Sequence, residues 1–330
     1  MPDRVAFTVF GIPVHWYGIM IMLGVLAASY VVYIEARRRG EDTDHVWQLF
    51  PWVLIAGILG ARIGWVVSEA GNRRFNDFWE VFAIQQGGLS IQGTIIGGAL
   101  AVVIYCRRYK LRFFKWVDMI APGLALGQAI GRWGNFFNQE AFGAPTDLPW
   151  GIPIDVRRQA EVAGPNAGFS PSSDLRFHPT FAYEMIWNLM NFGLLIWLGR
   201  QRRIRLREGD VFWVYLIFYS VGRYAIEELR VDSAIVSGFK APQLFSIAAI
   251  LFGLVMIAVR HSPNSKVPLS ATNLPHGATV ATQGRAETVA VDADADADAE
   301  GMTPRVRRVA RSARRGAGAT TTETSGAGTE

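Results

Sequence analysis

Hydrophobic residues in this chain are gathered in long runs, and polar or basic stretches separate the runs. Residues 16–34, 81–106 and 241–259 contain no charged side chain. A helix of about 20 apolar residues crosses the roughly 30 Å hydrocarbon core of a bilayer. Each of these runs is therefore long enough to be a transmembrane helix.

The whole pattern predicts about seven transmembrane helices, so the expected fold class is an all-α, polytopic membrane protein. The predicted helices are, by residue number, about 16–35, 46–68, 87–106, 116–138, 181–199, 210–228 and 241–260. The composition agrees, since half of the 330 residues are hydrophobic and eleven are tryptophan. The first run has no basic segment or cleavage site before it, so we expect a retained helix and not a removed signal peptide.

Basic residues follow every second predicted helix boundary. The clusters lie at residues 37–39, 107–115 and 200–207. Basic loops mark the cytoplasmic side of a membrane protein. The pattern therefore predicts a bundle with its N-terminus outside and its C-terminus in the cytoplasm. The net charge of +5 agrees, because the residues from 261 onward hold eight basic and eight acidic side chains, which leaves the surplus among the helices.

The chain divides into two predicted parts. Residues 1–260 form the seven-span domain, with a long exterior connection at about 141–178 that is rich in proline and glycine and is expected to form a small cap or arm. Within residues 261–330, residues 292–300 alternate acid with alanine, residues 305–315 are basic, and the rest is rich in serine, threonine, glycine and alanine. Such a composition cannot bury a core, so we predict a disordered cytoplasmic tail.

The predicted orientation brings polar residues of six helices to one level, the outer leaflet. They are Tyr17, Arg62, Gln92, Arg132, Glu140, Tyr183, Glu184, Arg223 and Glu227. A charge at the bilayer centre costs about 2.5–3.5 kcal/mol on insertion scales, and such charges are usually paired or functional. The sequence therefore predicts a polar site at the outer membrane boundary.

Two classes of protein bring charges into a helical bundle in this way, an enzyme and a transporter or lipid flippase. A transporter would have inverted repeats with broken helices near the midplane, and the sequence has no matching halves.

The one cysteine, Cys106, excludes an internal disulfide, and we expect it to be packed. The histidines have no metal-ligand spacing and no nucleotide-binding loop is present, so neither a metal, a cofactor nor a nucleic-acid partner is predicted.

Residues 131–143, read G-R-W-G-N-F-F-N-Q-E-A-F-G, closely resemble the signature of the bacterial prolipoprotein diacylglyceryl transferases. Further stretches fit the same family in the same order. They are H-W-Y-G at 15–18, A-R-I-G at 61–64, G-G-L-S at 87–90, H-P-T-F-A-Y-E at 178–184, and Gly222-Arg223 with Glu227 and Arg230. The resemblance covers residues 1 to about 260 and leaves out the tail.

The resemblance implies a reaction, its partners and a location. A transferase of this family moves the diacylglyceryl group of phosphatidylglycerol to the lipobox cysteine of a prolipoprotein signal peptide, forming a thioether and releasing glycerol 1-phosphate. The implied location is the bacterial cell membrane, with the active site facing the extracytoplasmic leaflet and membrane lipids around it. Both substrates present their reacting atoms at that boundary, where the polar residues are predicted.

The chemistry and the resemblance together assign roles to the motif residues. Arginine donates paired hydrogen bonds to phosphate oxygens and stays charged, so Arg132 and Arg223 are expected to grip the phosphate. The other residues expected to act in catalysis or substrate binding are Tyr17, Asn135, Glu140, Arg62, Gly143, Tyr183, Glu227 and Gln92. Among these, Glu140 and Glu227 would either orient the arginines or accept a proton, and Gly143 would give backbone clearance. Arg62 would either help the other arginines to hold the phosphate or form a structural pair with a nearby glutamate.

Position 92 departs from the family pattern. Many members carry histidine there, which suits a base for the thiol, whereas this chain has Gln92. Glutamine cannot act as a base near neutral pH, although it can donate and accept hydrogen bonds. Either another residue takes the proton, Glu140 being the nearest plausible one, or water does so and the arginines stabilise the thiolate.

Overall fold

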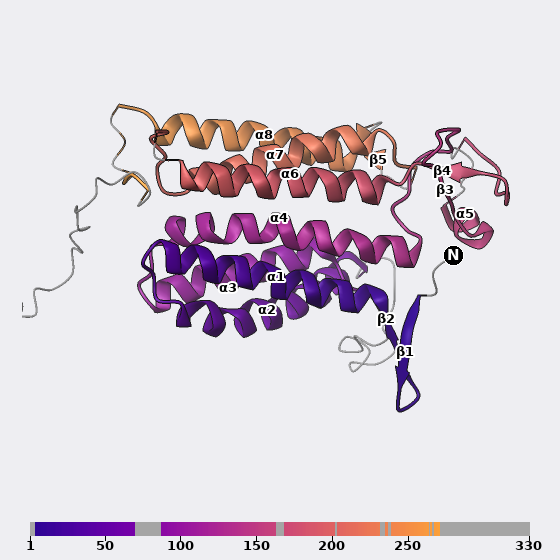
Figure 1. The fold of residues 1–330 in the computed structure, drawn as a ribbon, viewed down its shortest axis with the longest axis horizontal. Helices are drawn as coiled ribbons and strands as arrows, with labels where there is room; N and C mark the ends of the chain where they lie inside the picture. The colour runs from indigo at the N-terminus through magenta and orange to yellow at the C-terminus, as the bar shows by residue number, and fades with distance from the viewer. Residues whose placement is uncertain are drawn as a thin grey trace, which may run out of the picture. The chain divides into compact units, whose positions relative to one another are not determined.

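The chain is mostly helical in the parts that a computed structural model describes (Figure 1). These are residues 4–69, 87–162, 168–201, 203–231, 235–236, 239–263, 265 and 267–270. The described helices of 18 residues or more are α1 (Trp16–Arg38), α2 (Asp44–Glu69), α3 (Ile91–Arg108), α4 (Phe113–Asn138), α6 (Thr180–Arg200), α7 (Asp210–Glu227) and α8 (Ala241–Arg260). A shorter helix, α5, covers Val156–Val162.

These long helices coincide with the predicted segments to within a few residues at most ends. The start of the third segment is the clearest difference, because α3 begins at Ile91 and not at residue 87. Gly87 and Gly88 have φ values of +82° and +77°, which belong to the left-handed region that helices avoid. Ser90 then caps α3, its hydroxyl accepting a hydrogen bond from the Gly93 amide at 3.3 Å.

Three of the described helices, α1, α2 and α8, are long and apolar enough to cross a membrane. Their outward faces are apolar, and on α8 the exposed side chains include Phe245 and Leu251. The buried side of the bundle holds glutamate, aspartate, asparagine and arginine as well as apolar residues. A polar interior with an apolar exterior suits lipid and not water as the surrounding solvent.

Helix α4 lies between α1 on one side and α6 on the other, while α2 pairs with α3 and α7 pairs with α8 (Figure 1). Small residues bring two of these pairs close together. A Cβ atom on Gly24 of α1 would lie 2.8 Å from the Gly127 carbonyl oxygen of α4. A Cβ on Gly60 of α2 would lie 2.3 Å from the Gly93 oxygen of α3. Close backbone contact through glycine is typical of helix pairs in membranes.

Three short antiparallel pairs of strands, which the all-α prediction did not include, accompany the described helices. They are β1 (Val5–Val9) with β2 (Ile12–His15), β3 (Ile152–Pro153) with β4 (Arg176–Phe177), and β5 (Ile235–Val236) with β6 (Phe239–Lys240). The first pair leads directly into α1, and the second lies in the connection at 141–178 that was predicted to form a cap. A small core of Phe142, Ile154 and Phe177 packs inside this connection.

A second set of buried charges lies at the other end of the bundle, where α1 ends and α4 and α7 begin. Asp118 is fully buried, and its carboxylate accepts hydrogen bonds from the amides of Gly209 at 2.7 Å and Phe212 at 3.0 Å. The chain after α8 returns to this end, where the Ser270 amide donates to the Leu206 oxygen at 2.8 Å. The predicted tail from residue 271 onward lies outside the described residues.

Candidate active site

Five charged side chains meet where α4 ends, α6 begins and α7 ends. They are Arg132, Glu184, Arg223, Glu227 and Arg230, here called the arginine–glutamate cluster. Residues more than 90 positions apart in the sequence contribute to it, so the tertiary packing of three helices creates the cluster.

Glu184 lies at the centre of this cluster. One carboxylate oxygen, Oε2, pairs with Nη2 of Arg132. The other, Oε1, accepts a hydrogen bond from Nη1 of Arg223 at 2.8 Å and lies 3.5 Å from Nη1 of Arg230. A single carboxylate therefore holds three guanidinium groups that come from different parts of the chain.

Glu227 contacts two of these arginines, Arg223 and Arg230. Its Oε2 lies 2.7 Å from Nη2 of Arg223 and 4.0 Å from Nε of Arg230. Arg223 and Glu227 are four residues apart on α7, so one helical turn brings them together. Arg223 is held at both nitrogens of its fork, and its orientation is set by two carboxylates from two helices.

The two kinds of residue differ in exposure. The side chains of Glu184 and Glu227 are 3% and 1% exposed, whereas those of Arg132, Arg223 and Arg230 are 20%, 17% and 13% exposed. Buried carboxylates thus support guanidinium groups whose edges remain open. Three positive and two negative charges leave the cluster with one net positive charge, which suits a singly charged phosphodiester.

A row of hydrogen bonds extends the cluster along the end of α4. Nη1 of Arg132 donates to Oδ1 of Asn135 at 3.3 Å, and Nδ2 of Asn135 donates to Oε1 of Glu140 at 2.8 Å. Asn138 lies 3.5 Å from the same Glu140 oxygen. Glu140 is exposed, so the structure brings this predicted residue beside the cluster but leaves its carboxylate accessible to solvent.

Tyr17 approaches the same end of α4 from α1. A Cβ on Gly134 would lie 2.6 Å from the Tyr17 ring, so the absence of a side chain at this position makes room for the tyrosine. Next to it, Trp16 stacks on Phe137 with ring centroids 5.0 Å apart. Tyr17 therefore lies beside the helical turn that carries Arg132 and Asn135.

Gly143 has no side chain, and other parts of this chain pack closely against its backbone. A Cβ here would lie 2.8 Å from both the His178 Cβ and the Leu229 oxygen. Gly143 also forms an isolated β-bridge with Arg230. The glycine thus allows the end of the α4 connection to dock on the segment that carries Arg230.

Arg62 and Gln92 lie where α2 and α3 meet. Arg62 is 5% exposed, and its Nη1 donates to the carbonyl oxygens of Gly87 at 2.7 Å and Gly88 at 3.0 Å. Its guanidinium also lies 4.5 Å from the Trp65 ring centroid. Gln92 is exposed and accepts a hydrogen bond from the Ser90 hydroxyl at 2.9 Å. These contacts order the glycine loop before α3.

Tyr183 contacts the connection between α4 and α6. Its hydroxyl accepts a hydrogen bond from Nε1 of Trp150 at 2.8 Å and lies 3.2 Å from Nδ1 of His178.

Two members of the cluster were not among the residues expected to act in catalysis or substrate binding. They are Glu184, next to Tyr183, and Arg230, after α7. Both belong to the quoted motifs, and that membership was the signal available in the sequence.

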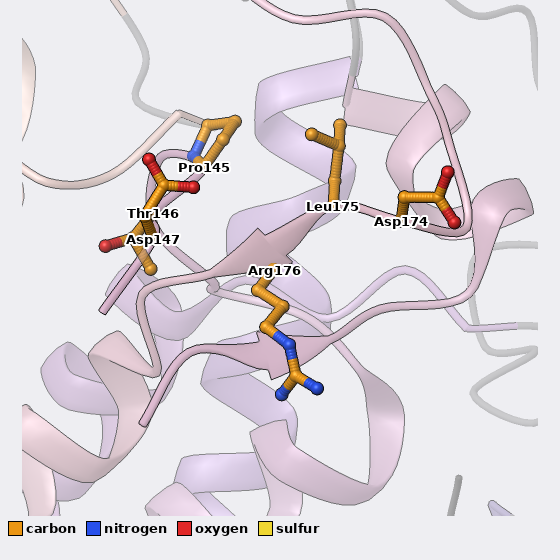
Figure 2. A pocket seen from close by; sticks show the side chains of 6 residues that line it. All are labelled: Pro145, Thr146, Asp147, Asp174, Leu175 and Arg176. Carbon is orange, nitrogen blue, oxygen red and sulfur yellow. The ribbon is translucent and has the colours of Figure 1, made fainter. Parts of the chain in front are cut away.

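A separate hollow of about 290 Å³ lies on the surface of the 141–178 connection (Figure 2). Its polar lining residues are Thr146, Asp147, Asp174 and Arg176. Their side chains point in different directions in Figure 2, so they do not converge on a common point. Among the described residues, no group of three or more His, Cys, Asp or Glu side chains could hold a metal ion.

Comparison with known proteins connects this geometry to a family. Residues 4–259 match the family model described as prolipoprotein diacylglyceryl transferase. A phosphatidylglycerol–prolipoprotein diacylglyceryl transferase of Chloroflexus aggregans is 42% identical over 284 residues, which cover 79% of this chain and 90% of the relative. A protein with the same description from Synechococcus elongatus is 42% identical, and the match covers 73% of this chain and 82% of that relative. One from Finegoldia magna is 37% identical, and the match covers 77% of this chain and 94% of that relative.

Proposed function

Since the chain belongs to the prolipoprotein diacylglyceryl transferase family, we propose that its arginine–glutamate cluster is the place where the phosphate of phosphatidylglycerol is held during transfer. The activity follows from membership of the family: a diacylglyceryl group passes from phosphatidylglycerol to a prolipoprotein. The observation that carries the proposal is that Arg132 and Arg223, from different helices, share the carboxylate of Glu184.

The proposed acceptor is the thiol of a lipobox cysteine in the prolipoprotein signal peptide. Its sulfur attacks the glyceryl carbon that carries the phosphate, and a carbon–sulfur bond forms as the carbon–oxygen bond breaks. The electron pair of that bond leaves with the phosphate of glycerol 1-phosphate. Arg132 and Arg223 stabilise the charge that develops on the leaving oxygen, because guanidinium groups that carboxylates already hold in place need little reorganisation to donate hydrogen bonds to it.

In this mechanism Glu184 and Glu227 orient the arginines, and their deep burial supports that role. Asn135 and Tyr17 position the head group from the end of α4 and the start of α1. Arg62 orders the loop before α3, next to Gln92. Tyr183 and Gly143 shape the connection that covers the cluster.

For the proton of the thiol, we assign Glu140 as the acceptor. It is the exposed carboxylate of the set and is hydrogen-bonded through Asn135 to Arg132.

A Glu140→Gln variant should therefore transfer the lipid more slowly at neutral pH and recover part of its rate at alkaline pH, where the thiol ionises without a base. Gln92→Ala should slow the transfer less than Glu140→Gln does, because glutamine cannot act as the base. An unchanged rate for Glu140→Gln together with a large loss for Gln92→Ala would reverse the assignment.

We further propose that all seven long helices cross the bacterial cell membrane, with the cluster in the extracytoplasmic leaflet. Support comes from the basic segments after α1, α3 and α6, which all lie at helix ends remote from the cluster. The 141–178 connection would then cover the outer face, and the chain beyond α8 would lie in the cytoplasm.

The direct test of this function uses the purified protein, phosphatidylglycerol and a lipobox peptide. Mass spectrometry should detect a peptide that carries a diacylglyceryl thioether, together with free glycerol 1-phosphate. The same peptide with serine in place of cysteine is the control and should give no product. Thioether formation from the cysteine peptide supports the proposal, and its absence with a folded protein overturns it.

A further inference from the structure

A narrow hollow extends from the cluster between α6 and α7. It is lined by Glu184, Trp187, Asn188, Tyr219, Gly222, Arg223 and Ile226, and its volume is about 10 Å³. That is about the room of one water-sized group. Because Glu184 and Arg223 belong to both the hollow and the cluster, a molecule whose phosphate is held by Arg223 lies at the entrance of the hollow.

Asn188 stands out among the residues that line this hollow. It lies one helical turn beyond Glu184 on α6 and is 2% exposed. Its side-chain oxygen, Oδ1, is buried and accepts no hydrogen bond from the described part of the protein. Burying an amide oxygen without a donor is unfavourable, so a donor on a bound molecule would relieve that cost.

Trp187 and Gly222 form a wall of the hollow that is already fixed by contacts within the protein. The indole Nε1 of Trp187 donates to the Phe218 oxygen at 2.8 Å, so it is engaged within the protein. The ring packs on Gly222, where a Cβ would lie 2.1 Å from Nε1. The buried side-chain atom in this lining that lacks a partner among the described residues is Oδ1 of Asn188, which is an acceptor. The matching ligand group is therefore a neutral donor of about the size of a hydroxyl.

We propose that Asn188 accepts a hydrogen bond from a hydroxyl of the glycerol head group and so selects lipids whose head group carries that hydroxyl. The inference rests on the proposed function, because the phosphate must be held at Arg223 for the head group to reach the hollow. The free hydroxyls of glycerol are on the carbons that follow the phosphate ester, so one of them can enter a hollow that opens beside the phosphate. Asn188 is thus a specificity-determining residue.

The test compares two lipids with the same acyl chains and the same charge, phosphatidylglycerol and phosphatidylpropanol, whose head group has no hydroxyl. With a lipobox peptide as acceptor, the unmodified protein should have a kcat/KM for phosphatidylglycerol about 10–100-fold above that for phosphatidylpropanol, as expected when one hydrogen bond to a buried acceptor is lost. The Asn188→Leu variant should lose that preference, because its kcat/KM should fall for phosphatidylglycerol and stay the same for phosphatidylpropanol.

Asn191→Leu is the matched control. Asn191 is on the same helix, is 0% exposed and also has an unpartnered Oδ1, but it does not line the hollow. Its variant should keep the lipid preference of the unmodified protein. Equal slowing of Asn188→Leu with both lipids, or an unmodified protein that uses both lipids equally, would overturn the inference. No thioether from either lipid would instead overturn the proposed function.

Discussion

Two buried glutamates give the cluster its geometry at the scale of single residues. Glu184 holds Arg132, Arg223 and Arg230, and Glu227 holds the last two. Guanidinium groups repel one another, so without carboxylates between them they would not stay close together inside a bundle. In the proposed function, the phosphate contacts the partly exposed arginines, while the two carboxylates stay buried.

Glu184→Gln should therefore destabilise the protein and also lower the rate of diacylglyceryl transfer. The change removes the charge that three guanidinium groups share, and breaking a buried ion pair from one side costs about 3–5 kcal/mol. We expect a clear fall in Tm in detergent. Glu140→Gln is the control, because Glu140 is exposed and its loss should leave Tm nearly unchanged. Equal Tm values for the two variants would contradict the central position of Glu184.

The sequence motifs predicted that Arg132, Arg223 and Glu227 belong to one site, and the structure brings them into one cluster. They did not identify Glu184 as the central partner, since helical spacing alone cannot say which glutamate faces three arginines from other segments. They also could not reveal that Tyr183 bonds to Trp150 and His178. Such pairings depend on the tertiary packing of α4, α6 and the connection between them.

At the scale of helices, close packing by glycine holds α2 against α3. Gly60 and Gly93 face each other, and Gly97 fits against Ala56, where a Cβ would lie 2.1 Å from the Ala56 oxygen. The same helix pair carries Arg62 and the loop at Gly87 and Gly88. The spacing of these two helices therefore sets the position of Arg62.

Gly60→Ala should push α2 away from α3, because the new methyl group would meet a backbone oxygen that cannot rotate away. Overpacking of this kind costs about 1–3 kcal/mol, and thermal unfolding in detergent measures it as a lower Tm. Gly193→Ala on α6 is the matched control, since nothing lies within 4 Å of a Cβ there. If Gly193→Ala lowers Tm as much as Gly60→Ala, helix packing by glycine is not what stabilises this pair.

The bounds of the long helices could be predicted well, because apolar runs of spanning length and basic residues after them are strong local signals. The short strands β1 and β2 could not, since five residues such as Val5–Val9 have no decisive period of their own. Their pairing depends on the turn at Phe10 and Gly11, both with positive φ. The start of α3 depended similarly on two glycines and a serine cap.

At the scale of the whole described bundle, charged residues are buried at both ends. One end holds the arginine–glutamate cluster. The other holds Asp118, bound to the amides at the start of α7, and Arg39, whose Nη1 lies 4.0 Å from Asp118. Because basic segments surround this second end, the proposed topology assigns it to the cytoplasm.

Labelling of single cysteines tests that topology. In a Cys106→Ala background, Ile12→Cys on the hairpin before α1 should react with a membrane-impermeant maleimide in intact spheroplasts. Ile204→Cys, between α6 and α7, should react only after lysis. Ile12 and Ile204 are both exposed, so access to the reagent and not burial decides the outcome. The reverse labelling pattern would show that the orientation is inverted.

The most direct measurement for the whole account is the initial rate of thioether formation by Arg223→Lys. A lysine keeps the charge but cannot bridge Glu184 and Glu227 while offering a planar fork to phosphate. The rate should fall about 100-fold, as when a preorganised donor to a developing oxyanion is removed, while the yield of folded protein stays the same. Arg157→Lys, the same change at an exposed arginine of α5, should keep the full rate. A rate for Arg223→Lys close to that of the unmodified protein would contradict the claim that the cluster holds the lipid phosphate.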